Sequence, residues 1–256
     1  MSAPTTLLTP QGRRLAYHRL EGAAPTLVFL GGLRSDMEGT KALHLETWCQ
    51  TRGQGFLRFD YSGHGQSSGT FSEGCIGDWF EDTLAAVDRL IEGSMVVVGS
   101  SMGGWLALLL AQARPKQVAG VITIAAAPDF TEDAYWAQFS PAQKEALARV
   151  GHVEIPSEYG SPYSITRRLI EEGRRWLVLR RPLPLKVPTY FLQGSADTAV
   201  PLAMAHRLFD HAQGEDMRLI VVKGKDHRFS DTACLNLIET CAAQCLDKAA
   251  EPYGDG

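Results

Sequence analysis

The sequence of 256 residues lacks any apolar run near the roughly 20 residues that span a bilayer, so we expect no membrane span. Residues 1–10 lack a charged segment followed by an apolar one, and we therefore expect no signal peptide or other removable targeting segment. A basic tail, low-complexity runs and internal repeats are also missing, and the formal net charge is −4. This charge balance gives no reason to expect a nucleic-acid partner.

Cysteine is scarce as well, because the chain has only five. An odd number in a chain of this size is typical of unpaired thiols in a reducing compartment. Cys241 and Cys245 lie on one predicted helix, but no neighbouring pair of Cys or His completes a metal set. We therefore expect neither a metal nor another cofactor.

The composition is that of an ordinary globular protein, with 45% hydrophobic and 21% charged residues. Short apolar segments at Thr26–Leu30, Gly55–Asp60 and Met95–Val98 alternate with segments that favour helix. This alternation predicts an α/β fold, in which a mostly parallel sheet is covered by helices on both faces.

The most specific pattern lies where a β-branched strand at Met95–Val98 runs into an Ala- and Leu-rich helix. Between them is Gly99-Ser100-Ser101-Met102-Gly103, a G-x-S-x-G pentapeptide. A tight strand-turn-helix projects the central Ser101 from the backbone, where an adjacent base can make its hydroxyl a nucleophile. Glycine is expected at both ends of the motif because strand and helix come too close there for a Cβ. The alternative is that the two serines only cap an ordinary buried helix.

A second turn with two glycines, Gly31 and Gly32, directly follows the strand Thr26–Leu30. It is expected at the carboxyl edge of the sheet, where ligands bind in open α/β folds. We predict that the backbone N–H groups of Leu33 and Met102 form an oxyanion hole, which stabilises a negatively charged oxygen. The alternative is a tight turn that contacts no substrate.

Two more candidates follow predicted strands at the same edge: Asp197 follows one strand, and His227 lies on the loop after the last strand. The order Ser101, Asp197, His227 is that of nucleophile, acid and base in the α/β-hydrolase fold. His227 is predicted to take the serine proton and return it to the leaving group, while Asp197 fixes the imidazole tautomer. Asp129 also follows a strand and is a rival for the acid.

Residues 129–186 break the alternation of strand and helix and predict a mainly helical cap, inserted between core segments 1–128 and 187–256. Such an insertion lies over the crevice, so aromatic residues of the cap are candidates for lining an acyl or aryl pocket. These aromatics are Phe130, Tyr135, Trp136, Phe139, Tyr159, Tyr163 and Trp176. The alternative is that they only pack the cap onto the core.

The cap is also rich in positive charge, with seven basic residues against Glu171 and Glu172 between residues 167 and 186. One or two of the basic side chains could hold a substrate carboxylate or phosphate. The alternative is that they form a solvated face. The basic residues are Arg167, Arg168, Arg174, Arg175, Arg180, Arg181 and Lys186.

Four stretches together resemble the family of the mitochondrial palmitoyl-protein thioesterase, also described as an acyl-glucuronide esterase, and its bacterial relatives. They are Gly39–Ala42, Arg58–Gly63, Val98–Trp105 and Asp226–Arg228. The resemblance implies an α/β-hydrolase that cleaves thioesters or activated esters, with Ser101, Asp197 and His227 at the family's triad positions. Because no transit peptide precedes the first predicted strand, we expect a cytoplasmic, bacterial-type enzyme.

We therefore predict a cofactor-free serine esterase or thioesterase that acts through an acyl-enzyme. Its expected partner is a small-molecule ester or thioester, or an S-acylated protein. Two alternatives remain on the same fold: a carbon-carbon hydrolase or lyase, and a non-catalytic receptor for a small molecule. The acyl chain, the leaving group and the oligomeric state stay open.

Overall fold

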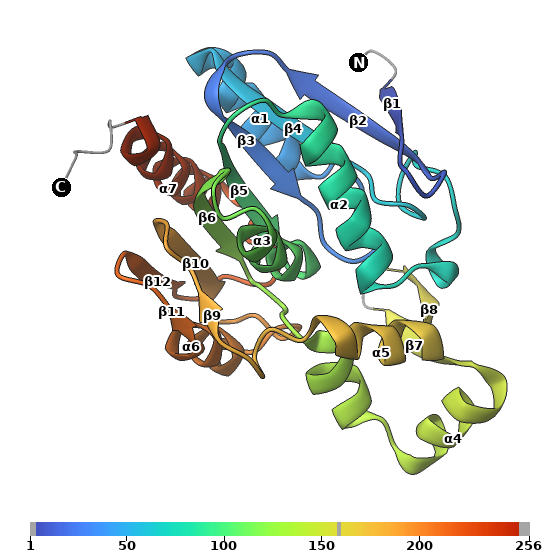
Figure 1. The fold of residues 1–256 in the computed structure, drawn as a ribbon. Coiled ribbons are helices and arrows are strands. Elements are labelled where there is room, and N and C mark those ends of the chain that lie inside the picture. Colours follow the sequence, from blue (N-terminus) through green and yellow to red (C-terminus); the bar gives the residue numbers. More distant parts are fainter. Residues whose placement is uncertain (1–3, 158–159, 251–256) are drawn as a thin grey trace.

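The computed structural model describes residues 4–157 and 160–250, and its main feature is an eight-stranded sheet (Figure 1). In spatial order the strands are β1 (Thr5–Leu8), β2 (Arg14–Leu20), β4 (Gln54–Phe59), β3 (Ala23–Leu30), β5 (Met95–Ser100), β6 (Val118–Ile124), β10 (Thr189–Gly194) and β12 (Met217–Val222). The pairs β1–β2 and β2–β4 are antiparallel, and the remaining neighbours are parallel. The predicted α/β fold with a mostly parallel sheet is confirmed.

Helices cover both faces of this sheet, which explains why its central strands are continuous apolar runs. Every residue of β5 is buried. One face packs against α1 (Thr40–Arg52) and α7 (Thr232–Ala250), through residues such as Leu45 and Ile238. The other face packs against α2 (Ile76–Leu90), α3 (Met102–Ala113) and α6 (Leu202–His211), and Figure 1 shows α2 and α3 together on this side.

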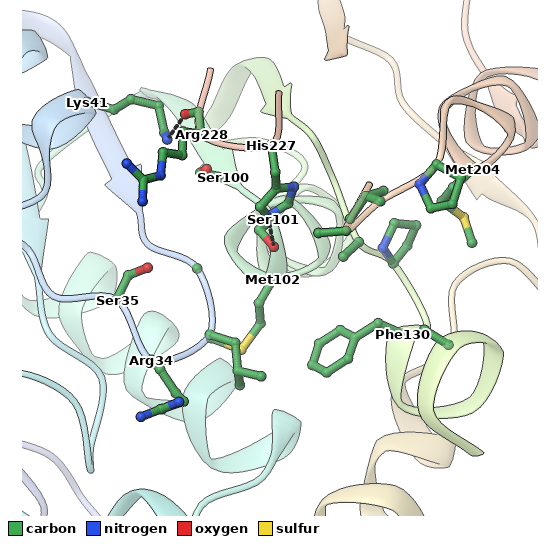
Figure 2. Close-up of a pocket in the computed structure, with 18 of the residues that line it drawn as sticks. Arg34, Ser35, Lys41, Ser100, Ser101, Met102, Phe130, Met204, His227 and Arg228 are labelled. Atoms are coloured by element: carbon green, nitrogen blue, oxygen red, sulfur yellow. Dashed lines mark hydrogen bonds between the residues drawn. The ribbon is translucent and has the colours of Figure 1, made fainter. Parts of the chain in front are cut away.

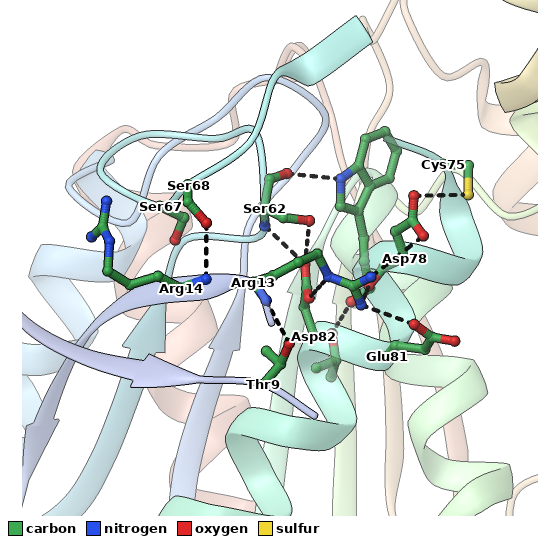
Figure 3. Close-up of polar contacts among 12 residues, drawn as sticks. Thr9, Arg13, Arg14, Ser62, Ser67, Ser68, Cys75, Asp78, Glu81 and Asp82 are labelled. Atoms are coloured by element: carbon green, nitrogen blue, oxygen red, sulfur yellow. Dashed lines mark hydrogen bonds and ion pairs between the residues drawn. The ribbon is translucent and has the colours of Figure 1, made fainter. Parts of the chain in front are cut away.

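A buried carboxylate on α2 joins the amino-terminal hairpin to the rest of the core (Figure 3). Asp82 accepts hydrogen bonds from the backbone N–H of Ser62 at 2.8 Å and from its hydroxyl at 2.6 Å. The Nε of Arg13, in the turn between β1 and β2, donates to the same carboxylate at 2.7 Å. Because a buried charge is tolerated only when it is paired and hydrogen-bonded, these contacts fix the hairpin and the loop after β4 against α2.

The chain between β6 and β10 lies beyond the carboxyl ends of the central strands, where the cap is expected (Figure 1). Its main elements are a π-helix at Thr131–Trp136, α4 (Pro141–Val150), β7 (His152–Ser157), β8 (Gly160–Thr166) and α5 (Arg167–Gly173). The antiparallel β7–β8 hairpin is an addition to the predicted helical cap. Pro156 and Pro162 lie in these strands, and proline argues against a strand because it cannot donate to the ladder.

Strand β9 (Leu183–Pro184) lies in the segment that leads from the cap to β10, and it pairs with β11 (Ala212–Gln213), which follows α6. On the core side, the indole Nε1 of Trp105 on α3 donates to the backbone oxygen of Trp176 at 3.0 Å. The division of the chain into core 1–128, cap 129–186 and core 187–256 stays a prediction, and Tyr159 and both chain ends lie outside the described residues.

Candidate active site

Ser101 occupies the sharp turn between β5 and α3. Its φ of +56° and ψ of −117° are values that residues with a side chain rarely adopt. Holding such a conformation costs on the order of 1–3 kcal/mol, so the surrounding structure must impose it. Backbone hydrogen bonds do so, because the N–H of Ser101 donates to Ile124 at 2.9 Å and its oxygen accepts from Gly104 at 2.9 Å.

The glycines of the motif are required by close approach, as expected. A Cβ on Gly99 would lie 2.2 Å from the backbone oxygen of Gly103, and a Cβ on Gly103 would lie 2.1 Å from that of Leu30. Both positions lie far inside van der Waals contact with backbone atoms that cannot move away. Strand β5, strand β3 and helix α3 can therefore meet closely only because these residues have no side chain.

The structure brings the three predicted catalytic residues together from three distant segments. The Nε2 of His227 lies 3.2 Å from the Oγ of Ser101 (Figure 2). The Nδ1 of the same imidazole lies 2.8 Å from the Oδ2 of Asp197. Asp197 follows β10 and His227 follows β12, so both stand at the carboxyl edge of the sheet beside the end of β5.

The Asp197 carboxylate is fully buried and held from several sides. Its Oδ1 accepts the backbone N–H groups of Ala199 at 2.9 Å and Val200 at 2.8 Å, and its Oδ2 accepts the Gln193 amide at 3.0 Å. Burial by itself raises the pKa of Asp197, but the hydrogen bonds from His227, Val200 and Gln193 outweigh it and hold the pKa below its ordinary value. The carboxylate is thus fixed in its charged form, aimed at the imidazole.

The rival acid, Asp129, has a different role. Its buried carboxylate accepts the backbone N–H of Val178 at 2.7 Å and of Leu179 at 3.0 Å, and a guanidinium N–H of Arg180 at 2.6 Å. Burial raises the pKa of Asp129, and these same three groups oppose the rise. Asp129 therefore attaches the carboxyl-terminal part of the cap to the end of β6, through partners that belong to the cap.

The two predicted oxyanion donors both line the cavity around Ser101. Met102 is the first residue of α3, where backbone N–H groups have no acceptor within the helix. The turn that carries Leu33 packs directly against the serine, since a Cβ on Gly32 would lie 3.3 Å from the Cβ of Ser101. Within the described residues no hydrogen bond uses the N–H of Leu33, so this donor is available for a ligand.

The cavity has a volume of about 700 Å³ and two chemically different sides. Figure 2 shows Phe130 and Met204 on one side of Ser101, and Arg34, Lys41 and Arg228 on the other. Among the predicted cap aromatics that the structure describes, those that line the cavity are Phe130, Tyr135 and Tyr163. The hydroxyls of the two tyrosines are hydrogen-bonded to each other at 2.8 Å.

Among the described residues that line this cavity, none is a basic residue of segment 167–186. Several of those side chains are instead used in ion pairs: Arg174 with Glu132 at 2.7 Å, Arg168 with Asp78 at 2.8 Å, and Arg180 with Asp129. The cavity takes its positive charge from Arg34, Lys41 and Arg228. Lys41 and Arg228 lie in two of the stretches that carry the family resemblance, and Arg34 lies outside them. Arg34 lies in the turn after β3, Lys41 in the first turn of α1 and Arg228 in the loop after β12.

Comparison with known proteins agrees with this geometry. Residues 46–239 match the model of the Alpha/beta hydrolase family. The chain therefore belongs to the alpha/beta hydrolase family. It is 36% identical over 244 residues to the mitochondrial palmitoyl-protein thioesterase ABHD10 of Rattus norvegicus, a match that covers 94% of this chain and 82% of the relative. The human protein of the same name is 35% identical over 241 residues, covering 93% of this chain and 78% of the relative.

Solved structures give the same result. A putative hydrolase from Agrobacterium vitis S4 superimposes with a TM-score of 0.91 at 38% identity, covering 95% of this chain and 98% of the other. Alpha/beta hydrolase domain-containing protein 10 from mouse superimposes with a TM-score of 0.90 at 35% identity, covering 97% and 100%. The resemblance expected from the sequence motifs is thus confirmed, and the thioesterase-named relatives support a hydrolase role.

The predicted cytoplasmic location is wrong by the same comparison, because the relatives that match over most of the chain are named as mitochondrial proteins. The prediction relied on unpaired thiols, which occur in more than one reducing compartment, and on the lack of a targeting pattern in the first residues, and the names of the relatives outweigh both. In the part of the chain that the structure describes, no helix is long and apolar enough to cross a membrane.

Proposed function

We propose that this protein is a serine hydrolase that cleaves carboxylic esters or thioesters through an acyl-enzyme. Ser101 is the nucleophile, His227 the base and Asp197 the acid that orients it, and the N–H groups of Leu33 and Met102 form the oxyanion hole. The observation that carries the proposal is the continuous hydrogen-bonded path from Asp197 through His227 to Ser101, with distances of 2.8 and 3.2 Å, at the wall of a large cavity.

In the first half of the reaction, the Oγ of Ser101 attacks the carbonyl carbon while the Nε2 of His227 takes the hydroxyl proton. The carbonyl oxygen becomes an oxyanion that accepts hydrogen bonds from the two backbone donors. The bond to the leaving oxygen or sulfur then breaks, and His227 passes its proton to that atom. The buried Asp197 carboxylate stabilises the imidazolium that exists between these two proton transfers.

In the second half, water replaces the leaving group. His227 takes a proton from the water, whose oxygen attacks the acyl-enzyme carbonyl and again forms an oxyanion in the same hole. Collapse of this intermediate releases the carboxylic acid, and the proton on His227 returns to the Oγ of Ser101. The enzyme is regenerated without a cofactor.

The acyl group is expected on the apolar side of the cavity, against Phe130, Val200 and Met204. Burial of methylene groups there is favourable by about 0.8 kcal/mol each. The relatives are named palmitoyl-protein thioesterases, which supports S-acylated peptides or proteins as one substrate class beside small esters.

Fluorophosphonate labelling tests the proposal together with turnover of p-nitrophenyl butanoate and an S-acyl peptide. The wild-type protein should be labelled on Ser101 and should hydrolyse at least one of the two substrates. Ser101→Ala should lose labelling, and its kcat should fall by about 10⁴ or more. A folded Ser101→Ala protein that keeps wild-type turnover would refute the assignment of the nucleophile.

A further inference from the structure

Two of the stretches that carry the family resemblance, Gly39–Ala42 and Arg58–Gly63, contain no residue of the proposed triad or oxyanion hole. The structure connects both stretches to the loop of the catalytic base. The Nζ of Lys41, in the first turn of α1, donates to the backbone oxygen of Arg228 at 2.6 Å (Figure 2). Arg228 directly follows His227, so this hydrogen bond joins α1 to the backbone beside the imidazole.

We propose that Lys41 is a positioning residue for His227. Its hydrogen bond to Arg228 fixes the backbone directly after the base and holds the imidazole within reach of the Ser101 hydroxyl. The inference rests on the proposed function and deepens it, because it gives the base a second support beside Asp197. Lys41 acts through the imidazole and takes no part in the proton transfers.

The catalytic base needs such a support because His227 lies between β12 and α7, in a loop that belongs to no helix or strand. On one side of the imidazole, the backbone oxygen of Lys225 accepts the N–H of Ala196 at 2.9 Å. On the other side, the oxygen of Arg228 accepts from Lys41. The 3.2 Å between the imidazole Nε2 and the serine Oγ is at the long end of the hydrogen-bond range, so a loop shift of about 1 Å would open this contact.

Lys41 is itself held by buried groups at the start of α1. The backbone N–H of Met37 donates to the Oδ1 of Asp60 at 2.6 Å, and its oxygen accepts the guanidinium of Arg58 at 3.0 Å. The side chains of Arg58 and Asp60 are buried, and the same guanidinium pairs with Glu46 on α1 at 2.9 Å. The segment before α1 is therefore fixed to the end of β4, which gives Lys41 a rigid base.

The hydrogen bond from Lys41 is of a strong type. An ammonium N–H that donates to a carbonyl oxygen is charge-assisted, and such bonds are stronger than those between neutral groups. Burial lowers the pKa of Lys41 to about 8, although the Asp226 carboxylate opposes this effect, so the ammonium form prevails at pH 7. In the part of the chain that the structure describes, the bond to Arg228 is the one hydrogen bond that Lys41 makes, so its substitution tests this single contact.

The test measures kcat and KM for p-nitrophenyl butanoate, which has no net charge, so the charge of Lys41 has no ionic partner in the substrate. Lys41→Met keeps much of the length of the side chain and removes the donor. We expect kcat to fall by about 10- to 100-fold. KM should stay within about threefold, because the base acts in both halves of the reaction and both slow together. Lys41→Arg can donate to the same oxygen and should restore kcat to within about fivefold of the wild type.

Lys248→Met is the matched control. Lys248 on α7 is hydrogen-bonded to the carboxylate of Asp216, which directly precedes β12, so it anchors the opposite end of the strand that leads to His227. This variant should keep kcat within about twofold. Thermal melting shows whether each variant is folded. If Lys41→Met does not fold, Lys41→Gln replaces it, since its side chain is one bond shorter and uncharged, and the same loss of kcat is expected.

Proton NMR gives a second readout that a loss of stability alone would not change. The Nδ1 proton, which the imidazole of His227 shares with Asp197, reports the position of the ring through its chemical shift. Lys41→Met should shift or broaden this resonance. Lys41→Arg and Lys248→Met should keep it at the wild-type position.

The outcomes separate the positioning role from the proposed function. If the wild-type protein hydrolyses the ester and folded Lys41→Met keeps kcat within threefold, the inference is wrong and the hydrolase assignment stands. A lower kcat with an unchanged Nδ1 resonance would also overturn it, because Lys41 would then act on something other than the imidazole. If the wild-type protein hydrolyses neither this ester nor an S-acyl peptide, the proposed function fails and the positioning role fails with it. Loss of kcat with a changed resonance, both restored in Lys41→Arg, supports the inference.

Discussion

Replacing Asp197 by asparagine is expected to lower kcat by about 10³- to 10⁴-fold and to leave the protein folded. The side-chain oxygen of the asparagine can still accept the backbone N–H groups of Ala199 and Val200, which hold Oδ1 in the wild-type protein. The amide NH₂ then replaces Oδ2, which accepts from Gln193 and faces the Nδ1 of His227. The asparagine NH₂ and a protonated Nδ1 are both donors and cannot hydrogen-bond to each other. The imidazole therefore takes the tautomer that carries its proton on Nε2, and this nitrogen cannot accept the proton of Ser101.

The expected cost in stability is smaller than the effect on catalysis. Loss of charge-assisted hydrogen bonds to a fully buried carboxylate costs about 1–3 kcal/mol, against a typical total of roughly 5–15 kcal/mol. The pKa of Asp197 is lowered on folding, so the charged group contributes stability above its unfolded pKa of about 3.9. That contribution is lost as the pH falls through the lower folded pKa, so the stability gap between wild type and variant should narrow in acid.

The assay is kcat for a p-nitrophenyl ester with thermal melting of the same samples at several pH values. Asp129→Asn is the matched control, since Asp129 is equally buried and accepts two backbone N–H groups and a guanidinium N–H, but contacts the cap. It should be destabilised to a similar degree while keeping kcat within about tenfold. The assignment of the acid would be refuted by full activity in Asp197→Asn, or by an equal loss of kcat in Asp129→Asn.

Three further predictions concern the framework around the site. Gly103→Ala should prevent folding or lower Tm by more than about 10 °C, because its Cβ would meet the Leu30 oxygen at 2.1 Å. Gly39→Ala, whose Cβ would have no atom nearer than 3.6 Å, should change Tm by about 2 °C at most, and equal melting of the two variants would contradict this prediction. Asp82→Ala should lower the free energy of unfolding by about 3 kcal/mol, because it leaves Arg13 without its buried partner. Asp88→Ala removes an exposed ion pair with Arg114 and should lower it by less than about 1 kcal/mol. Chemical denaturation measures both values, and similar costs would refute the role given to Asp82. Burial raises the pKa of the Cys49 and Cys245 thiols to about 12, so a thiol reagent at pH 8 should react slowly with the native protein and rapidly after denaturation. Rapid reaction of these thiols in the native protein would contradict this prediction.

Much of the site could be predicted from the sequence because its parts obey local or topological rules. The turn at Ser101 is encoded locally, by a buried strand, two glycines at fixed spacing and a helix. Asp197 and His227 could be placed because parallel strands bring their carboxyl ends to one edge of a sheet. Position in the chain alone favours Asp197 over Asp129, and only the structure shows which carboxylate faces the imidazole and which one binds the cap.

Other features depend on contacts that no local pattern contains. The basic residues that line the cavity are Arg34, Lys41 and Arg228, three of the 25 Lys and Arg residues. Two of them lie in stretches that carry the family resemblance, but no local pattern shows that their side chains face the cavity. The sequence instead draws attention to the dense basic segment of the cap, whose arginines bind acids such as Glu132 and Asp78. The β7–β8 hairpin escapes prediction because its strands contain proline.

The most direct test of the account is mass spectrometry of the protein quenched during turnover of a slowly hydrolysed ester, such as a p-nitrophenyl ester. We predict an added acyl mass on the peptide that contains Ser101, which decays as product forms and is absent in Ser101→Ala. An acyl group on a different residue, or steady turnover in Ser101→Ala, would contradict the central claim that this serine carries the acyl group.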